Sequence, residues 1–212
     1  MKITFLGTGT SIGVPQIGCG CEVCTSSDPR DRRLRASALF EEGDTRLLID
    51  CGPDFREQML RIKMQKPLDA VLITHEHYDH VGGIDDLRPF TFERNLPLYA
   101  DDYACRHLRQ RLPYCLVRHS YPGVPKLDMH ELKEGDKLQF GSLEVTAIRV
   151  MHGGKMTMQE FGKIFNAFME QITWTNYGGP IVTILGRDIM VFITGFLTHL
   201  CIEACQSYLR EE

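Results

Sequence analysis

Three histidines and one aspartate fall within six consecutive positions in the first half of the chain: His75, His77, Asp79 and His80. Imidazole nitrogen and carboxylate oxygen are ligands that zinc prefers, and catalytic zinc sites keep one coordination position open for water. A metal bound in this way lowers the pKa of its water to about 7 and so provides hydroxide at neutral pH. The motif therefore predicts a hydrolytic metal site, with His75 and His77 on one ion and Asp79 and His80 on a second.

A second group of candidate ligands consists of three of the eight cysteines, Cys19, Cys21 and Cys24. Thiolates at this spacing suit tetrahedral zinc, and in a reducing compartment a tight cysteine cluster indicates a metal site before it indicates disulfides. We therefore predict a structural zinc here, with a fourth ligand that the sequence does not reveal. Loop thiols that bind no metal and are prone to oxidation are the alternative.

The histidine motif follows an apolar run, residues 68–74, which is typical of a strand buried on both faces. A loop that leaves such a strand can point alternate side chains in the same direction, as a metal site requires. Further strands are predicted at residues 2–7, 36–42, 45–50, 96–100, 138–140, 143–150, 181–185 and 189–194. Helices are predicted at residues 53–64, 101–112, 157–172 and about 197–210.

Composition indicates one ordinary globular domain, residues 1–212, with 43% hydrophobic and 25% charged residues. The formal net charge of −4 argues against an obligate nucleic-acid partner, although a small phosphorylated substrate would need only a local basic pocket. No run approaches the roughly 20 apolar residues of a membrane span, and no signal-peptide pattern opens the chain. A cytoplasmic location, without a membrane partner, is the expectation.

The pattern His-x-His-x-Asp-His after a strand resembles the signature of the metallo-β-lactamase superfamily. Residues 2–11, residues 49–54 and the tripeptide Met151-His152-Gly153 also lie where that family places similar residues. The cysteine cluster is similar to that of the PhnP-like branch, which is related to the cyclic-phosphate phosphodiesterase of phosphonate breakdown. The resemblance covers about residues 1–153.

This resemblance implies an α/β (α+β) fold, the αββα metallo-β-lactamase sandwich, with two divalent metals at one edge of its sheets. His75, His77 and His152 would hold the first metal, and Asp79 and His80 the second. Asp79 would also orient or deprotonate the attacking water. Zinc is the default ion, and manganese or iron would also fit mixed nitrogen and oxygen ligands. In the related branch the cysteines, together with a later histidine, hold a structural zinc.

The sequence departs from the family pattern after His152. The strand that should end in an aspartate bridging both metals ends instead at Gly195, and Asp188 is the nearest acidic residue. Leu197-Thr198-His199 resembles the motif of a distal histidine ligand, so His199 is a candidate for the second metal. The helical segment 155–178 is atypical, and the sandwich is expected to be incomplete at its C-terminal end.

Three functions remain open. The first is a phosphodiesterase that acts on a small, cyclic or linear phosphodiester through metal-activated water, with a homodimer as one possible assembly. The second is a superfamily hydrolase acting on a thioester, a lactam or an RNA end. The third is a degenerate member with an incomplete second metal site and little activity. The basic run Arg30, Arg32, Arg33 and Arg35 is a solvated face, unless one arginine reaches a substrate phosphate.

Overall fold

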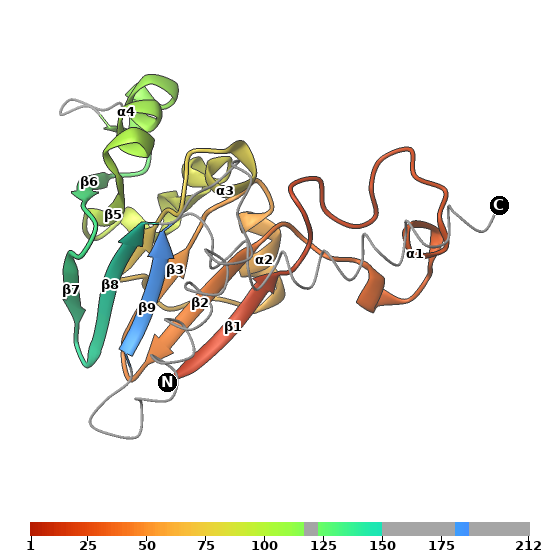
Figure 1. Cartoon of the computed structure of the whole chain (residues 1–212), viewed down its shortest axis with the longest axis horizontal. Coiled ribbons are helices and arrows are strands. Elements are labelled where there is room, and N and C mark those ends of the chain that lie inside the picture. The colour runs from red at the N-terminus through yellow and green to blue at the C-terminus, as the bar shows by residue number, and fades with distance from the viewer. Residues whose placement is uncertain (117–122, 150–180, 187–212) are drawn as a thin grey trace, which may run out of the picture.

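The computed structural model describes residues 1–116, 123–149 and 181–186 (Figure 1). The helices predicted at 157–172 and 197–210, the strand predicted at 189–194 and the atypical segment 155–178 lie outside these residues. So do His152, Asp188, Gly195 and His199. Among the described residues, none of the helices combines the length and the apolar character needed to cross a membrane.

The larger sheet has six strands in the order β1-β2-β3-β4-β5-β6. The first three strands are antiparallel neighbours, whereas β3 to β6 run parallel to one another. Their bounds are β1 Lys2–Gly7, β2 Ser37–Glu42, β3 Thr45–Ile49, β4 Ala70–Leu72, β5 Leu96–Asp101 and β6 Leu127–Leu132. The predicted buried strand is thus β4, and all three of its side chains are buried.

A second sheet packs on one face of the first. It consists of β7 (Lys137–Phe140), β8 (Leu143–Arg149) and β9 (Ile181–Gly186), with β8 antiparallel to β7 and parallel to β9. Leu143 and Val145 of β8 join Ala38, Ile49 and Leu72 of the first sheet in a buried apolar cluster. This cluster is the core between the two sheets.

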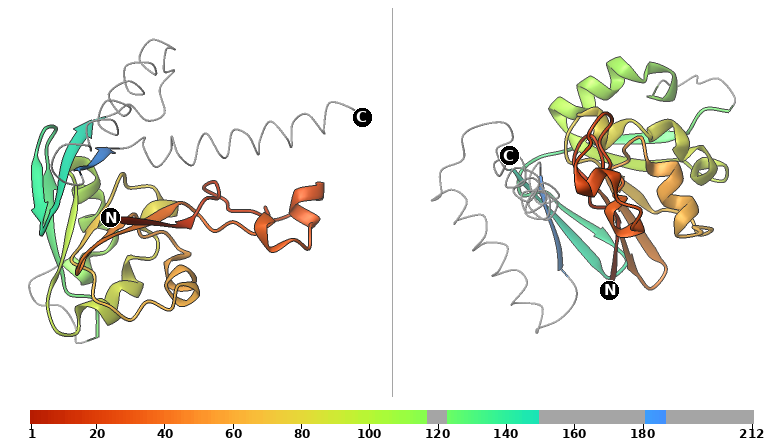
Figure 2. Two further views of the ribbon diagram at one scale, coloured as in Figure 1. Left: turned by 90° about the horizontal axis from the view of Figure 1, so that it is seen from below. Right: turned by 90° about the vertical axis from the view of Figure 1, so that its right-hand side faces the viewer.

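Helices cover the opposite face of the six-stranded sheet (Figure 2). Their apolar side chains, such as Phe55 and Leu108, pack against Leu48, Val71 and Leu98 in the larger buried cluster. The elements on this side are α2 Phe55–Arg61, α3 Tyr78–Val81, the 3-10 helix η2 Ile84–Thr91, α4 Asp102–Arg111 and α5 Pro113–Leu116. One helical layer and two sheets of the predicted αββα sandwich are therefore present in the described residues.

The parallel strands β3 and β4 deliver their following residues to the same edge of the sheet. Asp50 comes directly after β3, and the segment Ile73 to His75 follows β4. The ladder continues past the strand ends, because the Asp50 amide donates to the Leu72 carbonyl at 2.9 Å and the Ile73 amide to the Tyr99 carbonyl at 2.8 Å. This edge is where the histidine motif meets the loop after β3.

Two glycines let these two loops lie against each other. A Cβ atom at Gly52 would lie 2.0 Å from the carbonyl oxygen of Asp79, and one at Gly83 would lie 2.1 Å from the carbonyl oxygen of Gly52. Backbone bonds join the same segments, since the Cys51 amide donates to the His80 carbonyl and the Gly83 amide to the Cys51 carbonyl, both at 2.8 Å. Only glycine permits this backbone contact.

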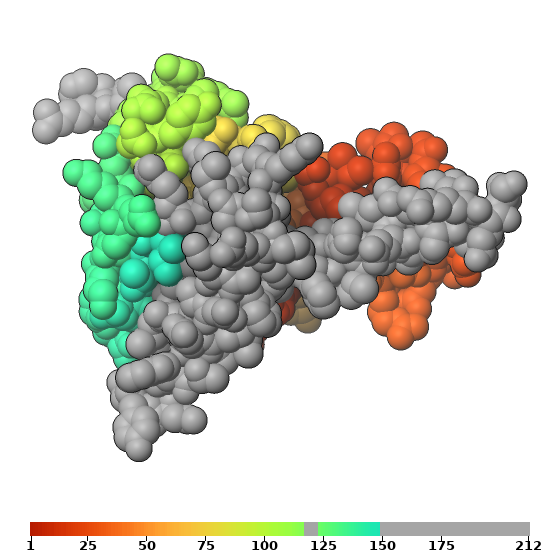
Figure 3. Space-filling view, in the orientation of Figure 1, coloured from red at the N-terminus to blue at the C-terminus, as the bar shows by residue number. Residues whose placement is uncertain are grey.

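An arm, residues 15–32, projects from the body of the molecule (Figures 1 and 3). It contains α1 (Glu22–Thr25) and the 3-10 helix η1 (Pro29–Asp31). Its neck is closed by backbone bonds, in which Val14 and Arg33 exchange amide-to-carbonyl bonds of 2.9 and 2.8 Å. The arm therefore leaves and rejoins the body at one place.

Most predicted elements within the described residues are confirmed, with shifted ends. The helix predicted from residue 53 begins at Phe55 and ends at Arg61, and the one predicted from residue 101 is α4. The strand β6 was not predicted, because its sequence Leu-Asp-Met-His-Glu-Leu carries three polar side chains. It lies at the edge of the six-stranded sheet, where polar side chains are tolerated. The short helices α1, α3 and α5 and the 3-10 helices were also not predicted.

We expect Gly52→Ala to destabilise the fold by about 1–3 kcal/mol, since the new methyl group must push the two loops apart. Urea unfolding followed by circular dichroism measures this change. Gly20→Ala is the matched control, because a Cβ atom there meets nothing within 4 Å. Equal stability of the two variants would show that the loops separate without cost.

Candidate metal centre

The centre of the site is the carboxylate of Asp50, which is fully buried. Its Oδ2 lies 2.7 Å from Nδ1 of His80. It also accepts the Thr74 amide at 2.8 Å and the Thr74 hydroxyl at 2.8 and 3.0 Å. Four contacts thus converge on one carboxylate, which ties the end of β3 to the whole histidine motif.

The backbone at Asp50 adopts a left-handed conformation, with φ of 59°. Aspartate and asparagine are the non-glycine residues that tolerate this conformation best. The turn is what aims the carboxylate along the sheet edge toward Thr74 and His80, so the residue type serves both the backbone and the site.

A relay of hydrogen bonds assigns the ring nitrogens of two histidines. The Thr74 hydroxyl donates to Asp50, so it accepts from Nδ1 of His75, which lies 3.1 Å away. His80 likewise donates from Nδ1 to Asp50. Nδ1 of both histidines is therefore engaged in the relay, so Nε2 is the ring nitrogen that each would turn to a metal, and the partner at Nδ1 fixes the ring for that role.

The three rings lie close together but differ in exposure. The His75 ring centroid is 4.6 Å from that of His77 and 4.1 Å from that of His80. His75 and His80 are buried, whereas the side chain of His77 is 53% exposed. Tyr78, which follows His77, is 67% exposed. The group is thus buried at its base and open to solvent on one side, as a catalytic metal site requires.

Asp79 and His80 form the second predicted ligand pair. His80 Nε2 lies 3.2 Å from Asp79 Oδ2. Two ligands of one tetrahedral zinc at about 2.1 Å are separated by roughly 3.4 Å, so this pair fits a shared ion. Beside this pair, His75 and His77 supply two further nitrogen donors of the same kind.

The carboxylates control the protonation of His80. Burial lowers the pKa of His80, but the carboxylates of Asp50 and Asp79 outweigh burial and raise that pKa to about 10. For Asp79, burial raises the pKa and the bond to His80 lowers it, with a net lowering. In the absence of a metal, His80 is therefore a cation at neutral pH and Asp79 an anion. A divalent ion would replace the His80 proton.

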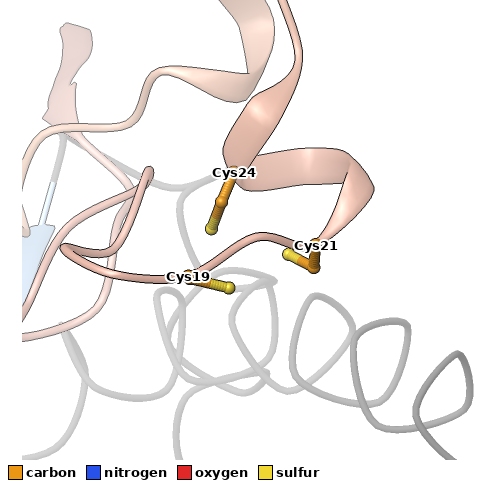
Figure 4. A group of neighbouring side chains, drawn as sticks. All are labelled: Cys19, Cys21 and Cys24. Carbon is orange, nitrogen blue, oxygen red and sulfur yellow. The ribbon is translucent and has the colours of Figure 1, made fainter.

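The three cysteines of the arm turn their thiols toward a common point (Figure 4). Their sulfur atoms all lie within 4.8 Å of one another, and in the described part of the chain they are the one set of three or more candidate ligands that gathers so tightly. The backbone bond from Gln16 lowers the pKa of the Cys24 thiol, but desolvation and the neighbouring thiols Cys19 and Cys21 raise it to about 11. A cation bound between the sulfur atoms would stabilise the thiolate form of Cys24 and so lower the pKa of this thiol.

Of the predicted ligands that the structure describes, His75, His77, Asp79 and His80 lie on the loop at the sheet edge, and the three cysteines lie on the arm with their thiols gathered together. The structure adds Asp50 and Thr74, which were not predicted as functional residues. The available signal was an acidic residue directly after the apolar strand at 45–49, because parallel strands end at a common edge. Whether His152 and His199 complete the centre stays a prediction, since both lie outside the described residues.

The chain belongs to the metallo-β-lactamase superfamily and resembles its PhnP-like branch. Residues 45–169 match the β-lactamase superfamily domain. A solved diphosphatase of the PhnP family superposes with a TM-score of 0.60 at 34% sequence identity, over 69% of this chain and 63% of that protein. Zinc-bound PqqB from Methylobacterium extorquens superposes with a TM-score of 0.52 at 25% identity, over 66% of this chain and 48% of PqqB.

A curated relative has a different name. An octanoyltransferase of Porphyromonas gingivalis is 47% identical over 154 residues, which are 72% of this chain but 31% of that protein. The chain thus spans about a third of this relative. Most of the octanoyltransferase lies outside the matched segment.

We expect metal binding at this site to release the His80 proton. Because the pKa of His80 is raised to about 10, apparent metal affinity should rise with pH by about tenfold per unit up to that pKa. Asp50→Asn keeps a residue that tolerates the left-handed backbone but removes the charge. We expect the wild type to release one proton per bound ion at pH 8, and the variant to release fewer.

Calorimetry in buffers of different ionisation enthalpy counts these protons. Asp54→Asn is the control, because the Asp54 carboxylate pairs with Arg35 rather than with a histidine. Equal proton release by the wild type and Asp50→Asn would contradict the role of Asp50. Because this pKa is raised, the contribution of His80 to the stability of the metal-free protein is fully present below the unfolded-state pKa of about 6.5 and is lost as pH rises through about 10.

Proposed function

We propose that this chain is a metal-dependent hydrolase, and specifically a phosphodiesterase for small phosphodiesters, cyclic ones included. The observation that carries the proposal is the buried Asp50 relay, which engages Nδ1 of His75 and His80 and so makes Nε2 the ligand nitrogen of each, beside Asp79 and the exposed His77. Such a relay is what a metal site needs and what a histidine-rich surface loop lacks.

Each residue has a definite task in this proposal. His75 and His77 hold one divalent ion, with His152 as the predicted third ligand, and Asp79 and His80 hold another. When bound, such ions lower the pKa of water and polarise phosphoryl oxygens. Asp79 has a lowered pKa, stays ionised at neutral pH and is 19% exposed in its side chain, so it is able to orient the attacking water and accept its proton.

The choice of a phosphorus ester over a lactam or thioester is supported by the solved relative. The PhnP-family protein with 34% identity is a diphosphatase by name. The octanoyltransferase name is weaker support for acyl transfer, because the matched segment is only 31% of that protein. The residues at the sheet edge are metal ligands by type rather than the Ser, Cys or Lys that a covalent acyl-transfer mechanism uses.

We further propose that the cysteine cluster binds a structural zinc. Three sulfur atoms within 4.8 Å of one another are compatible with roughly 3.8 Å between the ligands of a tetrahedral zinc site. The arm has little apolar packing of its own, since α1 and η1 contain no buried residue and Ile17 is 99% exposed. A metal would therefore supply the cross-link that the arm lacks.

We expect Cys24→Ser to remove about one metal ion per chain, as measured by elemental analysis of the purified protein, because two thiolates do not retain zinc as three do. The arm should then be cut faster by trypsin, since it carries Arg30 and Arg32. Cys115→Ser is the control, a buried cysteine of α5 outside the cluster, and it should keep the wild-type metal content. Unchanged metal content in Cys24→Ser would rule out the zinc.

We expect Asp79→Asn to lower kcat for a generic phosphodiester, bis(p-nitrophenyl) phosphate, by about 10²–10⁴-fold, because the proton acceptor and a ligand oxygen are weakened together. His77→Ala should lose metal from the same centre. His107→Ala, a histidine on α4, is the control and should keep wild-type activity. Release of p-nitrophenol measures the rate on manganese- or zinc-loaded protein.

Parallel assays with a chromogenic cephalosporin and a thioester separate the alternatives. Turnover of either in preference to the phosphodiester would assign the chain to another hydrolase class. Full metal occupancy without turnover of any substrate would identify a degenerate member, as the glycine at position 195 suggests.

A further inference from the structure

Helix α4 carries three arginines that differ in their partners. Arg106 forms an ion pair with Asp102 at 2.7 Å, and Arg109 forms one with Glu131 at 2.9 Å. Arg111, the last residue of the helix, instead donates from Nη1 to the backbone carbonyl of Glu76 at 2.7 Å. Among the described residues, no carboxylate lies within ion-pairing distance of Arg111, so its charge is not neutralised as those of its two neighbours are.

The carbonyl that holds Arg111 belongs to the metal motif. Glu76 is the residue between His75 and His77, and consecutive Cα atoms are about 3.8 Å apart. The guanidinium is therefore fixed beside the predicted ligands of the first metal, yet Arg111 itself is exposed. An arginine held by one of its nitrogens keeps the remaining donors of its planar fork for another acceptor.

Two arginines of the basic run are already engaged. In the basic run, Arg30 pairs with Asp28, and Arg35 pairs with Asp54 at 2.8 Å while also donating to the Ser11 carbonyl. These contacts lie within the arm and between its neck and Asp54, the residue before α2. Arg111 instead combines a guanidinium that no described carboxylate pairs with and a hydrogen bond to the metal motif.

We propose that Arg111 is a specificity-determining residue that binds a second anionic group of the substrate, separate from the phosphodiester that is cleaved. This inference rests on the proposed function. Arg111 is exposed and so lies at the rim of the site, whereas His75 and His80 are buried. The cleaved group would sit at the metals, so the rim arginine would meet the next anionic group, for which its bidentate geometry suits a phosphate.

A purely structural role for Arg111 makes a different prediction. If the guanidinium only braced the Glu76 carbonyl, its loss would disturb the metal ligands and slow every substrate alike. If it binds a second phosphate, its loss would affect only substrates that carry one. A pair of substrates that differ by one remote phosphate separates the two roles.

The test uses adenosine 2′,3′-cyclic phosphate and its 5′-phosphorylated counterpart with the manganese-loaded full chain. Wild-type protein should prefer the 5′-phosphorylated substrate. Arg111→Gln should lower kcat/KM for that substrate by about 10–100-fold, mainly through KM, and change the other by less than about threefold. Arg111→Lys should restore part of the preference, because it returns the charge without the fork.

Arg106→Gln and Arg109→Gln are the matched controls on the same helix and should keep the wild-type preference. An equal loss on both substrates in Arg111→Gln, or a wild type without preference, would overturn the proposal. If neither substrate is hydrolysed, the proposed function fails separately, and calorimetric binding of adenosine 5′-phosphate and adenosine decides the role of Arg111. Weaker binding of the phosphate alone in Arg111→Gln would support it, and equal binding to wild type and variant would refute it.

Discussion

The buried carboxylate of Asp50 is the constraint on which the rest of the site depends. It accepts bonds from Thr74 and His80 and, through the Thr74 hydroxyl, sets the ring nitrogen of His75. Burying a carboxylate without partners would cost free energy of folding, and burying a histidine without partners would also do so. Each group is therefore satisfied only when β3, β4 and the loops after them are in register, which makes the local geometry of the site inseparable from the fold of the sheet.

The backbone around this carboxylate is equally restricted. Gly52 and Gly83 allow the loop after β3 to touch the loop that carries the histidines, and the amide of Cys51 bonds to the carbonyl of His80. Positions that ligate metal need to be held to a fraction of an ångström, and rigid strand ends supported by a second layer of bonds provide this better than free loops. The parallel strands thus define where the histidines lie before any ion is present.

Much of the fold and the histidine motif could be predicted from the sequence, and the features that could not be predicted have physical reasons. The histidine motif and the strand before it are local patterns, so both were found. Asp50 was missed as a partner because 24 residues separate it from Thr74, and only the pairing of β3 with β4 brings them together. Arg111 was missed for the same reason, since its acceptor is 35 residues away in the sequence. In β6 the alternation of apolar and polar residues covers only Leu127 to His130, because Glu131 breaks it, and this is too short to identify a strand. His152 and His199 lie in the part of the chain that the structure does not describe.

The closed neck of the arm has a consequence for how the chain can vary. Because Val14 and Arg33 are bonded to each other, and a Cβ atom at Gly7 would lie 1.9 Å from the carbonyl oxygen of Arg35, the two ends of the excursion are fixed by the body alone. Each doubling of the length of such a loop costs only about 0.6 kcal/mol. Insertions, deletions or an engineered tag between residues 15 and 32 should therefore leave the sheet edge unaltered, and the arm is a place where the chain can acquire new sequence without rebuilding its core.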